Sequence, residues 1–363
     1  MAEITIKAPL KNTYKVLVEN NFDKLADCME AAECLGKKIC IVCDAKVWGH
    51  YGDNVAKLLS DKAANVISYI VKDEDCCTDL NFDSLIGILE DAGFDDDDIL
   101  IGLGGRNLCD YTGKAVANST KHLGLAYIPT SLASMADSTS VSIPGAMQDI
   151  RPIVFPKFVY CNTFCLETLS DKDYFSGFSL IMKTAIVKNA NIYEWLVDKL
   201  YEISDRDNDI ISDMIEQNIN LRRIYLEKDP NRKSEQLLLD LGIDFAKCIE
   251  KAKDYELSFG ECLSLGIIAA AHISMKRDML SLDEYLEIRD MFVPFNLPIT
   301  IENIDVDALG ADIIENTYED ENGKCFVLLK KIGKAVIDRN VTLEEVTAAL
   351  SEIRFSDDDY VVE

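Results

Sequence analysis

A glycine pair at the end of an apolar run is the first feature of this sequence that could carry chemistry. Gly104 and Gly105 follow the run Ile99–Leu103 and precede a helical stretch that contains Asp110. Glycine lets the backbone come close to a phosphate group, and the amides at a helix N-terminus favour negative charge. The loop lacks the full G-x-G-x-x-G dinucleotide fingerprint. It therefore fits both a simple strand-to-helix turn and a nucleotide-binding loop.

The elements around this loop alternate between strand-like and helical patterns. The continuous apolar run Lys38–Cys43 ends at Asp44 and predicts a buried parallel strand. Similar runs predict strands at 65–71, 99–103 and 124–128, with helices between them at 52–61 and 82–92. This alternation favours an α/β fold with a doubly wound parallel sheet.

The second half of the chain changes character at about residue 171. Its apolar spacing is mainly helical, with one late strand predicted at 326–329. We therefore expect two domains: an α/β dinucleotide-binding domain over 1–170 and a mainly α-helical metal- and substrate-type domain over 171–363. The linker should fall between 129 and 170. Sites in such proteins commonly lie in clefts.

The charge balance excludes some partners. The 363 residues include 37 Lys and Arg against 64 Asp and Glu, which gives a net charge of −27. A surface this acidic repels nucleic-acid backbones and anionic membranes. The N-terminus has no signal-peptide pattern, and no apolar stretch reaches the length of a membrane span. We expect a cytoplasmic protein.

Twelve cysteines are scattered along the chain, and we expect reduced, buried thiols. Cys40 and Cys43 have the spacing of a zinc-binding pair. However, they lie within a predicted strand, where residues three apart point to opposite faces, so we expect that the two thiols do not coordinate one metal ion.

Several segments, in order, resemble the 3-dehydroquinate synthase family over about residues 10–350. The segments that carry the resemblance are Val42–Val47 with Tyr51 and Gly52, Leu103–Gly105 with Asp110, Ile128–Ala133 with Asp137, Leu166–Ser170, Ser176–Lys183, Leu239–Gly242, Phe259–Glu261 and Gly323–Leu329.

This resemblance implies a fold, an activity and a set of ligands. The fold is an N-terminal NAD-binding α/β domain followed by an α-helical C-terminal domain, usually in a homodimer. The family enzyme works in the shikimate pathway and is a lyase that converts a seven-carbon sugar acid phosphate into 3-dehydroquinate, with bound NAD and a divalent metal, typically zinc. The resemblance implies that the cofactor-binding residues are Asp44, Gly104, Gly105, Asp110, Thr130 and Ser131.

The family's metal ligands are one glutamate and two histidines, and the matching positions here are Leu180, Ile243 and Phe259. None of these side chains offers a lone pair. We therefore expect no zinc or other divalent metal at the family site.

The substrate positions also depart from the family. Its third loop glycine is Arg106, whose side chain could either block a dinucleotide or bridge its phosphates. Several charged positions that the family uses for substrate anions carry other residues. The polar residues that remain as catalytic candidates are Asp137, Lys183, Arg222, Asp240 and Lys247, with Asp244 beside them.

Several of these polar residues could instead have a purely structural role. Asp44, Asp110 and Asp137 could be helix caps, and Lys183 could be a solvated lysine on a helix surface.

The sequence favours a family homologue that has lost the metal-dependent cyclisation and keeps binding of a nucleotide or another small molecule, or acts on a partner. Two alternatives stay open. One is an active or divergent 3-dehydroquinate synthase or sugar-phosphate cyclase. The other is an NAD-linked oxidoreductase that works without the usual metal site.

Overall fold

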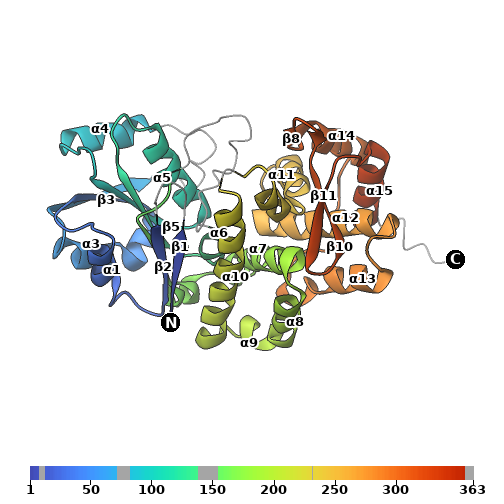
Figure 1. Ribbon diagram of the computed structural model, residues 1–363, viewed down its shortest axis with the longest axis horizontal. Coiled ribbons are helices and arrows are strands. Elements are labelled where there is room, and N and C mark those ends of the chain that lie inside the picture. The colour runs from blue at the N-terminus through green and yellow to red at the C-terminus, as the bar shows by residue number, and fades with distance from the viewer. Residues whose placement is uncertain (8–12, 72–81, 138–153, 231, 356–363) are drawn as a thin grey trace. The chain divides into compact units, whose positions relative to one another are not determined.

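The structure is a computed structural model that describes residues 1–7, 13–71, 82–137, 154–230 and 232–355 (Figure 1). The chain forms two compact units. Unit 1 comprises Met1–Leu169 and Asn208–Glu227, and unit 2 comprises Ser170–Asp207 and Lys228–Glu363. The acidic tail and the adjacent Cys76 and Cys77 lie outside the described residues.

Unit 1 is built on a seven-stranded sheet in the order β1-β2-β7-β6-β5-β3-β4. Only the β1–β2 pair is antiparallel, and the other neighbours run parallel. The strands are β1 (Ala2–Lys7), β2 (Thr13–Glu19), β3 (Lys38–Asp44), β4 (Asn65–Val71), β5 (Ile99–Gly104), β6 (Gly124–Pro129) and β7 (Phe158–Asn162). The continuous apolar runs of β3, β5 and β6 are buried because helices cover both faces of a parallel sheet. The predicted fold class is confirmed.

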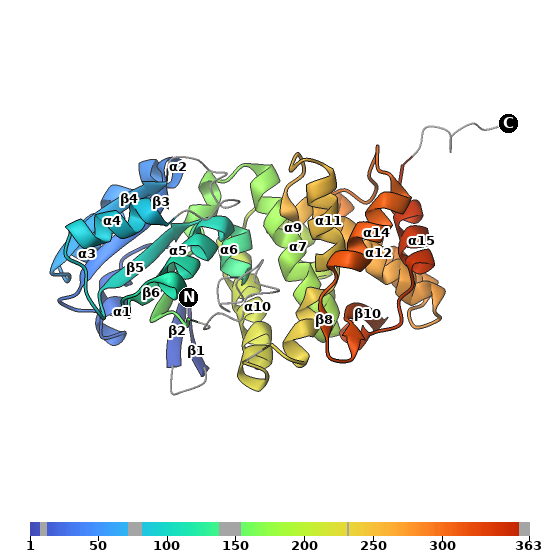
Figure 2. The same ribbon diagram turned by 90° about the horizontal axis from the view of Figure 1, so that it is seen from above.

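Helices cover both faces of this sheet: Figure 1 shows α4 and α5 on one side and α1 and α3 on the other. Seen from above, α5 runs alongside β5 and β6 (Figure 2). Helix α10 joins unit 1 although it lies beyond residue 170 in the sequence. The helical elements of this part are α1 (Leu25–Ala31), α2 (Ala45–Val47), η2 (Trp48–Gly52), α3 (Asp53–Ser60), α4 (Asp83–Asp91), α5 (Arg106–Asn118), α6 (Leu132–Asp137), η3 (Thr163–Thr168) and α10 (Asn208–Lys228).

Unit 2 is mainly helical, as its sequence pattern indicated. Its α helices are α7 (Asp171–Lys188), α8 (Ala190–Asp198), α9 (Leu200–Ser204), α11 (Ile243–Ala252), α12 (Phe259–Lys276), α13 (Leu282–Asp290), α14 (Val306–Asn316) and α15 (Leu343–Ile353). The short helical turns η4 (Glu235–Asp240) and η5 (Val293–Phe295) connect some of them. Two hairpins pair β8 (Glu319–Asp320) with β9 (Gly323–Lys324) and β10 (Phe326–Lys331) with β11 (Lys334–Asp338).

Glycines set how closely three helices of unit 2 approach one another. A Cβ on Gly242, which has φ +73°, would lie 2.5 Å from the amide nitrogen of Ile267 on α12. A Cβ on Gly266 would lie 2.2 Å from the carbonyl oxygen of Gly242, and one on Gly260 would lie 2.0 Å from that of Ser176 on α7. These are contacts with backbone atoms, so a larger residue would force the helices apart. We call these two close approaches the glycine crossings.

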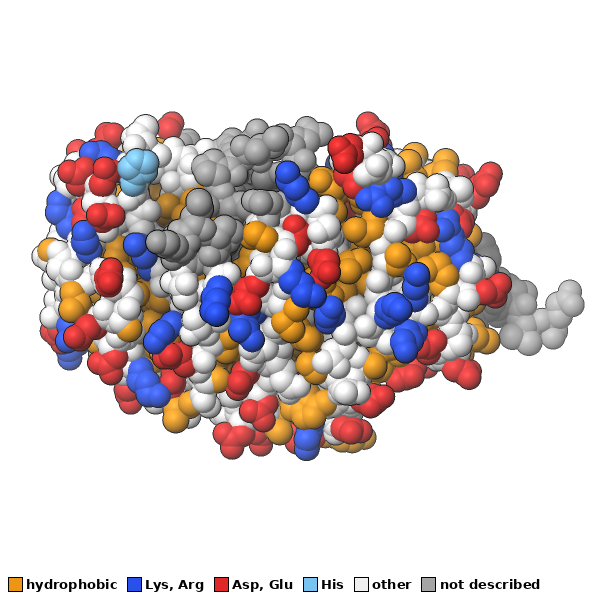
Figure 3. All heavy atoms as spheres, viewed as in Figure 1, with side chains coloured by type: hydrophobic (Ala, Val, Ile, Leu, Met, Phe, Trp, Pro, Cys, Tyr) orange, Lys and Arg blue, Asp and Glu red, His pale blue; other side chains and the backbone are white. Residues whose placement is uncertain are grey.

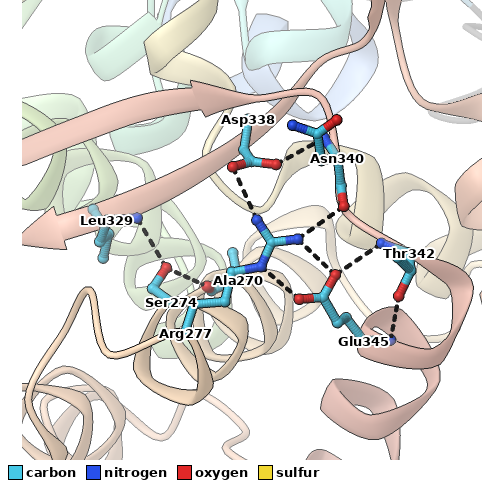
Figure 4. Close-up of polar contacts among 8 residues, drawn as sticks. All are labelled: Ala270, Ser274, Arg277, Leu329, Asp338, Asn340, Thr342 and Glu345. Carbon is cyan, nitrogen blue, oxygen red and sulfur yellow. Dashed lines mark hydrogen bonds and ion pairs between the residues drawn. The ribbon is translucent and has the colours of Figure 1, made fainter.

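An arginine ties the end of α12 to β11 and α15 (Figure 4). The Arg277 guanidinium bonds Glu345 through two nitrogens, the carbonyl oxygen of Asn340 at 2.9 Å and the carboxylate of Asp338 at 2.9 Å. Glu345 also completes the capping box of α15 with Thr342. The hydrogen bonds that Arg277 donates lower the pKa of Glu345. This cluster fixes the last helix of unit 2.

The ten described cysteines are free and buried. Burial raises the pKa of Cys40, and likewise that of Cys262, to about 12, so both stay protonated at neutral pH. Acidic and basic side chains are interspersed over the face seen in Figure 3. Across the described ranges, no helix has both the length and the apolar character that crossing a bilayer requires.

Candidate nucleotide site and the metal-ligand positions

The glycine loop lies where the strand order of unit 1 reverses. The chain passes from β3 to the edge strand β4 and then returns to β5 on the other side of β3. Helices that follow β3 and β5 therefore leave on opposite faces and open a crevice at the carboxyl ends of the two strands. Cys43 pairs with Leu103, so Asp44 and Gly104 stand side by side at this edge. Open α/β sheets bind their ligands at this point.

Gly104 and Gly105 differ in what would surround a side chain added at each position. A Cβ on Gly104 would lie 2.4 Å from Cδ2 of Leu108, so packing within the loop disfavours a side chain there. Gly105 is the N-cap of α5 in extended backbone, with φ −73° and ψ −177°. A Cβ at that position would meet only Oγ of Ser131, at an ordinary 3.7 Å. Neither backbone strain nor packing among the described residues requires glycine at 105, so the backbone at this position has open space beside it.

Thr130 and Ser131 continue the same edge at the end of β6. The Thr130 amide donates to the carbonyl oxygen of Gly104 at 2.9 Å, which joins the two strand ends. Ser131 and Ser134 exchange hydrogen bonds between each side chain and the other's amide at 3.0 and 3.2 Å. The structure thus brings four predicted cofactor residues, Gly104, Gly105, Thr130 and Ser131, to one edge of one sheet.

The two remaining predicted cofactor residues, Asp44 and Asp110, have different structural surroundings. Asp44 is a helix cap, because its Oδ1 accepts from the Val47 amide at 2.8 Å. Asp110 is not a cap and lies one turn inside α5. Burial raises its pKa to about 7, while the charge of Arg106 opposes the rise and that of Asp137 adds to it.

Asp137 lies at the end of the described part of α6 and pairs with two arginines. Its Oδ1 lies 2.6 Å from Nη2 of Arg222, and its Oδ2 lies 3.3 Å from Nε of Arg106. Asn218, one turn before Arg222 on α10, donates to the carbonyl oxygen of Ala136 at 2.9 Å. Our sequence reasoning missed Asn218, although its i, i+4 spacing from Arg222 places both on one helix face.

The other polar candidates lie in unit 2. Lys183 on α7 is 3% exposed, so the expectation of a solvated surface lysine is wrong. Asp240 pairs with Arg232, which presents one nitrogen to both carboxylate oxygens. Asp244, at the start of α11, is buried, and desolvation raises its pKa to about 7, with Asp240 adding to the rise and Lys247 opposing it. Asp244 is thus a carboxyl able to exchange a proton near neutral pH.

The three positions that match the family's metal ligands lie beside the glycine crossings. Ile243 follows Gly242, and Phe259 precedes Gly260. Leu180 lies one turn after Ser176 on α7, which faces Gly260. Leu180 and Ile243 are buried, and Phe259 is half-buried. The match to one set of metal ligands predicts that these three side chains lie together.

A cavity of about 1180 Å³ lies in unit 1, at the opposite end of the parallel strands from the glycine loop. Starts of β2 and β7 and the end of α5 line it. Three of its lysines are already paired: Lys15 with Glu3, Lys24 with Glu19 and Lys121 with Asp95. We assign it no role, and the converging polar groups favour the glycine-loop edge as the site.

Comparison with known proteins decides the family. Two adjoining family models match: 3-dehydroquinate synthase N-terminal over residues 68–176, and 3-dehydroquinate synthase C-terminal over residues 177–317. The chain belongs to the 3-dehydroquinate synthase family. The resemblance seen in the sequence is thereby confirmed.

Curated members of this family span nearly the whole chain. The 3-dehydroquinate synthase of Acetivibrio thermocellus is 24% identical over 355 residues, which cover 94% of this chain and 97% of that protein. The one from Idiomarina loihiensis is 29% identical over 272 residues, which cover 73% and 76%.

Solved structures share the fold. A 2-epi-5-epi-valiolone synthase from Streptomyces hygroscopicus, solved with NAD+ and Zn2+ bound, aligns with a TM-score of 0.80 at 20% identity and covers 94% of this chain and 96% of that one. A 2-deoxy-scyllo-inosose synthase, complexed with carbaglucose-6-phosphate, NAD+ and Co2+, aligns with a TM-score of 0.82 at 16% identity over 97% and 100%.

Proposed function

We propose that this member of the family binds NAD at the glycine-loop edge of unit 1 and does not carry out the metal-dependent cyclisation. The observation that carries the proposal is the contrast between the two units. Unit 1 presents the predicted loop residues together at one sheet edge. Unit 2 keeps the glycine crossings but has Leu180, Ile243 and Phe259 at the matched ligand positions.

The donor set at those positions does not fit a metal. Aliphatic and phenyl side chains have no lone pairs for Zn2+ or Co2+. Within the ranges that the structure describes, no group of three or more His, Cys, Asp and Glu side chains is arranged to hold an ion. Apolar side chains also fill such a pocket at a lower free-energy cost than unpaired polar groups would.

The edge of unit 1 does fit a dinucleotide. Gly105 leaves room beside its Cα, and the first amides of α5 point toward the side on which a phosphate would lie. Bound NAD would supply a hydride acceptor. The chain's own residues would hold its phosphates and ribose through Gly104, Gly105, Thr130 and Ser131, with the free oxygen of Asp44 as a further acceptor partner.

The test is a set of separate titrations and one assay. Thermal-shift and calorimetric titrations with NAD, NADH and Zn2+ should show binding of the dinucleotides and none of the metal. Turnover of the seven-carbon sugar acid phosphate, with NAD and Zn2+ or Co2+ supplied, should stay at the level of a buffer control. Stoichiometric Zn2+ binding or 3-dehydroquinate formation would overturn the proposal.

A matched variant sharpens this result. Leu180→Glu, Ile243→His and Phe259→His together restore the family's ligand types, and we expect this triple variant to bind Zn2+ where the parent does not. The parent and the triple variant differ only at these positions. Metal content after dialysis therefore tests the ligand assignment without depending on turnover.

One observation supports a second function, NAD-linked oxidoreduction without a metal. Asp244 is a buried carboxyl with a pKa of about 7 beside Lys247, and it could exchange a proton during alcohol oxidation. Reduction of NAD by polyols or sugar acids, abolished by Asp244→Asn, would favour this function.

The family resemblance also leads us to propose a cytoplasmic homodimer that takes a small-molecule or nucleotide ligand. Sedimentation that gives twice the 40.6 kDa chain mass would support the dimer.

A further inference from the structure

A short turn in unit 2 holds the one asparagine of this chain that a glycine follows, Asn322 with Gly323. The turn joins β8 to β9, and in this hairpin Glu319 pairs with Lys324 and Asp320 with Gly323. Asn322 is exposed. Gly323 has φ +118°, and a Cβ built on it would meet no atom within 4 Å. The main chain directly after Asn322 is therefore open on the side where a side chain would otherwise stand.

The side-chain amide of an asparagine reacts with the main-chain amide that follows it. The nitrogen of Gly323 attacks the side-chain carbonyl carbon of Asn322, a C–N bond forms, and the side-chain nitrogen leaves as ammonia with the proton of the attacking amide. Water then opens the five-membered imide ring. Opening at the side-chain carbonyl carbon gives aspartate, and opening at the main-chain carbonyl carbon gives isoaspartate. Glycine favours the attack because it has no Cβ to shield its nitrogen and adopts a wide range of backbone angles.

Asn340 provides a comparison within the same unit. The main-chain amide of Asn322 donates to Oδ1 of Asp320 at 2.8 Å, and that of Asn340 donates to Oδ1 of Asp338 at 2.8 Å. Both asparagines are exposed. Asn340 is followed by Val341, whose branched Cβ makes it stiff and shields its nitrogen. The two asparagines thus share a local hydrogen bond and differ in the residue that follows.

Lys324, two residues after Asn322, fastens this hairpin to the end of α14. Its Nζ donates to the carbonyl oxygen of Glu315 at 2.9 Å and to that of Thr317 at 3.3 Å, and it lies 3.3 Å from Oε2 of Glu319. A cation at a helix C-terminus is favourable. Isoaspartate places one more carbon in the main chain between positions 322 and 323. The hairpin then cannot keep both its pairing and the present position of Lys324.

We propose that Asn322 is a site of spontaneous deamidation, and that its isoaspartate product releases the C-terminal end of α14 from Lys324. The reaction consumes water and gives off ammonia, and it needs no enzyme, oxidant or reductant. It goes beyond the proposed function, because it concerns a covalent change in unit 2 with the age of the folded chain. Binding of NAD to unit 1 has no part in it.

The first test is incubation of the folded full chain at mildly alkaline pH, followed by mass spectrometry of its peptides. The peptide that contains Asn322 should gain about 1 Da as an amide becomes a carboxyl group. This should proceed at least about tenfold faster than at Asn340, because glycine follows one residue and valine the other. Asn322→Gln, which would have to form a larger ring, should abolish the change. Equal rates at the two asparagines, or reaction only in the unfolded chain, would overturn the proposal.

The second test is hydrogen exchange of the isoaspartate fraction against fresh protein. The amides in the last turn of α14 should exchange faster in the isoaspartate fraction, and those of α13 should not change. Asn322→Asp carries the new charge without the added main-chain carbon and should exchange like the fresh protein. Lys324→Met should reproduce the faster exchange without incubation. Unchanged exchange in the isoaspartate fraction, or equally fast exchange in Asn322→Asp, would overturn the release of α14.

Discussion

At the scale of single residues, the clearest contrast is between glycines that packing requires and one that it does not. Gly105 has an ordinary negative φ and open space beside its Cα. Under the proposed function, the open space beside Gly105, at the end of a central strand, takes a ligand that comes close to the backbone.

Gly105→Ala should therefore lower NAD affinity about tenfold or more while leaving the melting temperature nearly unchanged, because the added methyl group meets the ligand and not the protein. Gly87, inside α4 with no atom near its added Cβ, is the matched control. Gly87→Ala should stabilise the chain by about 0.5–1 kcal/mol without changing NAD affinity. Calorimetry and urea unfolding measure the two quantities. Equal NAD affinity in Gly105→Ala and the wild type would contradict the assignment.

A second prediction at this scale concerns Asp244. Because its folded-state pKa is about 7 and aspartate in unfolded chains titrates near 4, the folded state holds a proton between these pH values that the unfolded state has lost. Its contribution to the free energy of unfolding is thus fully present below about pH 4 and is lost as the pH rises through 7. Relative to wild type, Asp244→Asn should gain stability as the pH rises from 4 to 8, by up to about 4 kcal/mol, since each pKa unit of the shift is worth about 1.4 kcal/mol.

Urea unfolding at pH 5 and pH 8 measures this difference, and Asp283→Asn, on an exposed first turn of α13, is the control. A stability difference that does not change with pH would show that Asp244 titrates normally.

At the scale of elements, the sequence predicted the central strands well and the edge of the sheet poorly. β3, β5 and β6 are continuous apolar runs buried on both faces, which is a strong local signal. β1 alternates polar and apolar residues, the apolar run within β2 is only three residues long, and β7 lies within the stretch expected to be a linker. Their pairing therefore depends on distant partners. The packing of α10 into unit 1 could not be predicted either, because sequence order does not fix which core a helix joins.

The same limit applied to the site. The residues of the glycine loop could be predicted because they come directly after a strand. The Asp137–Arg222 pair could not, because its two residues lie 85 positions apart in the sequence. No local pattern reports such a contact.

The glycine crossings give a prediction about elements. Gly242→Ala should cost about 3 kcal/mol or more, because the residue has φ +73° and its Cβ would lie 2.5 Å from a backbone nitrogen of α12. Gly36→Ala is the matched control, since Gly36 has φ +70° but nothing within 4 Å. Its cost should be only the backbone part, about 1 kcal/mol. Urea unfolding followed by circular dichroism compares them, and equal losses would show that α11 can move away from α12.

At the scale of the whole molecule, the net charge of −27 is the dominant property. Self-repulsion of this size destabilises the folded state, and salt screens it. Raising NaCl from about 20 to about 200 mM should therefore raise the melting temperature by a few degrees, whereas an uncharged solute at equal osmolality serves as the control. A melting temperature that falls with salt would mean that attractive ion pairs outweigh the repulsion.

The buried thiols make the protein its own unfolding reporter. The described cysteines are shielded from solvent, and burial keeps those such as Cys40 and Cys262 from forming the reactive thiolate. Alkylation of these sites can then proceed only through molecules that have opened. Because Cys248, Cys262 and Cys325 belong to unit 2 and the remaining described thiols to unit 1, mass spectrometry of labelled peptides would time the opening of each unit separately.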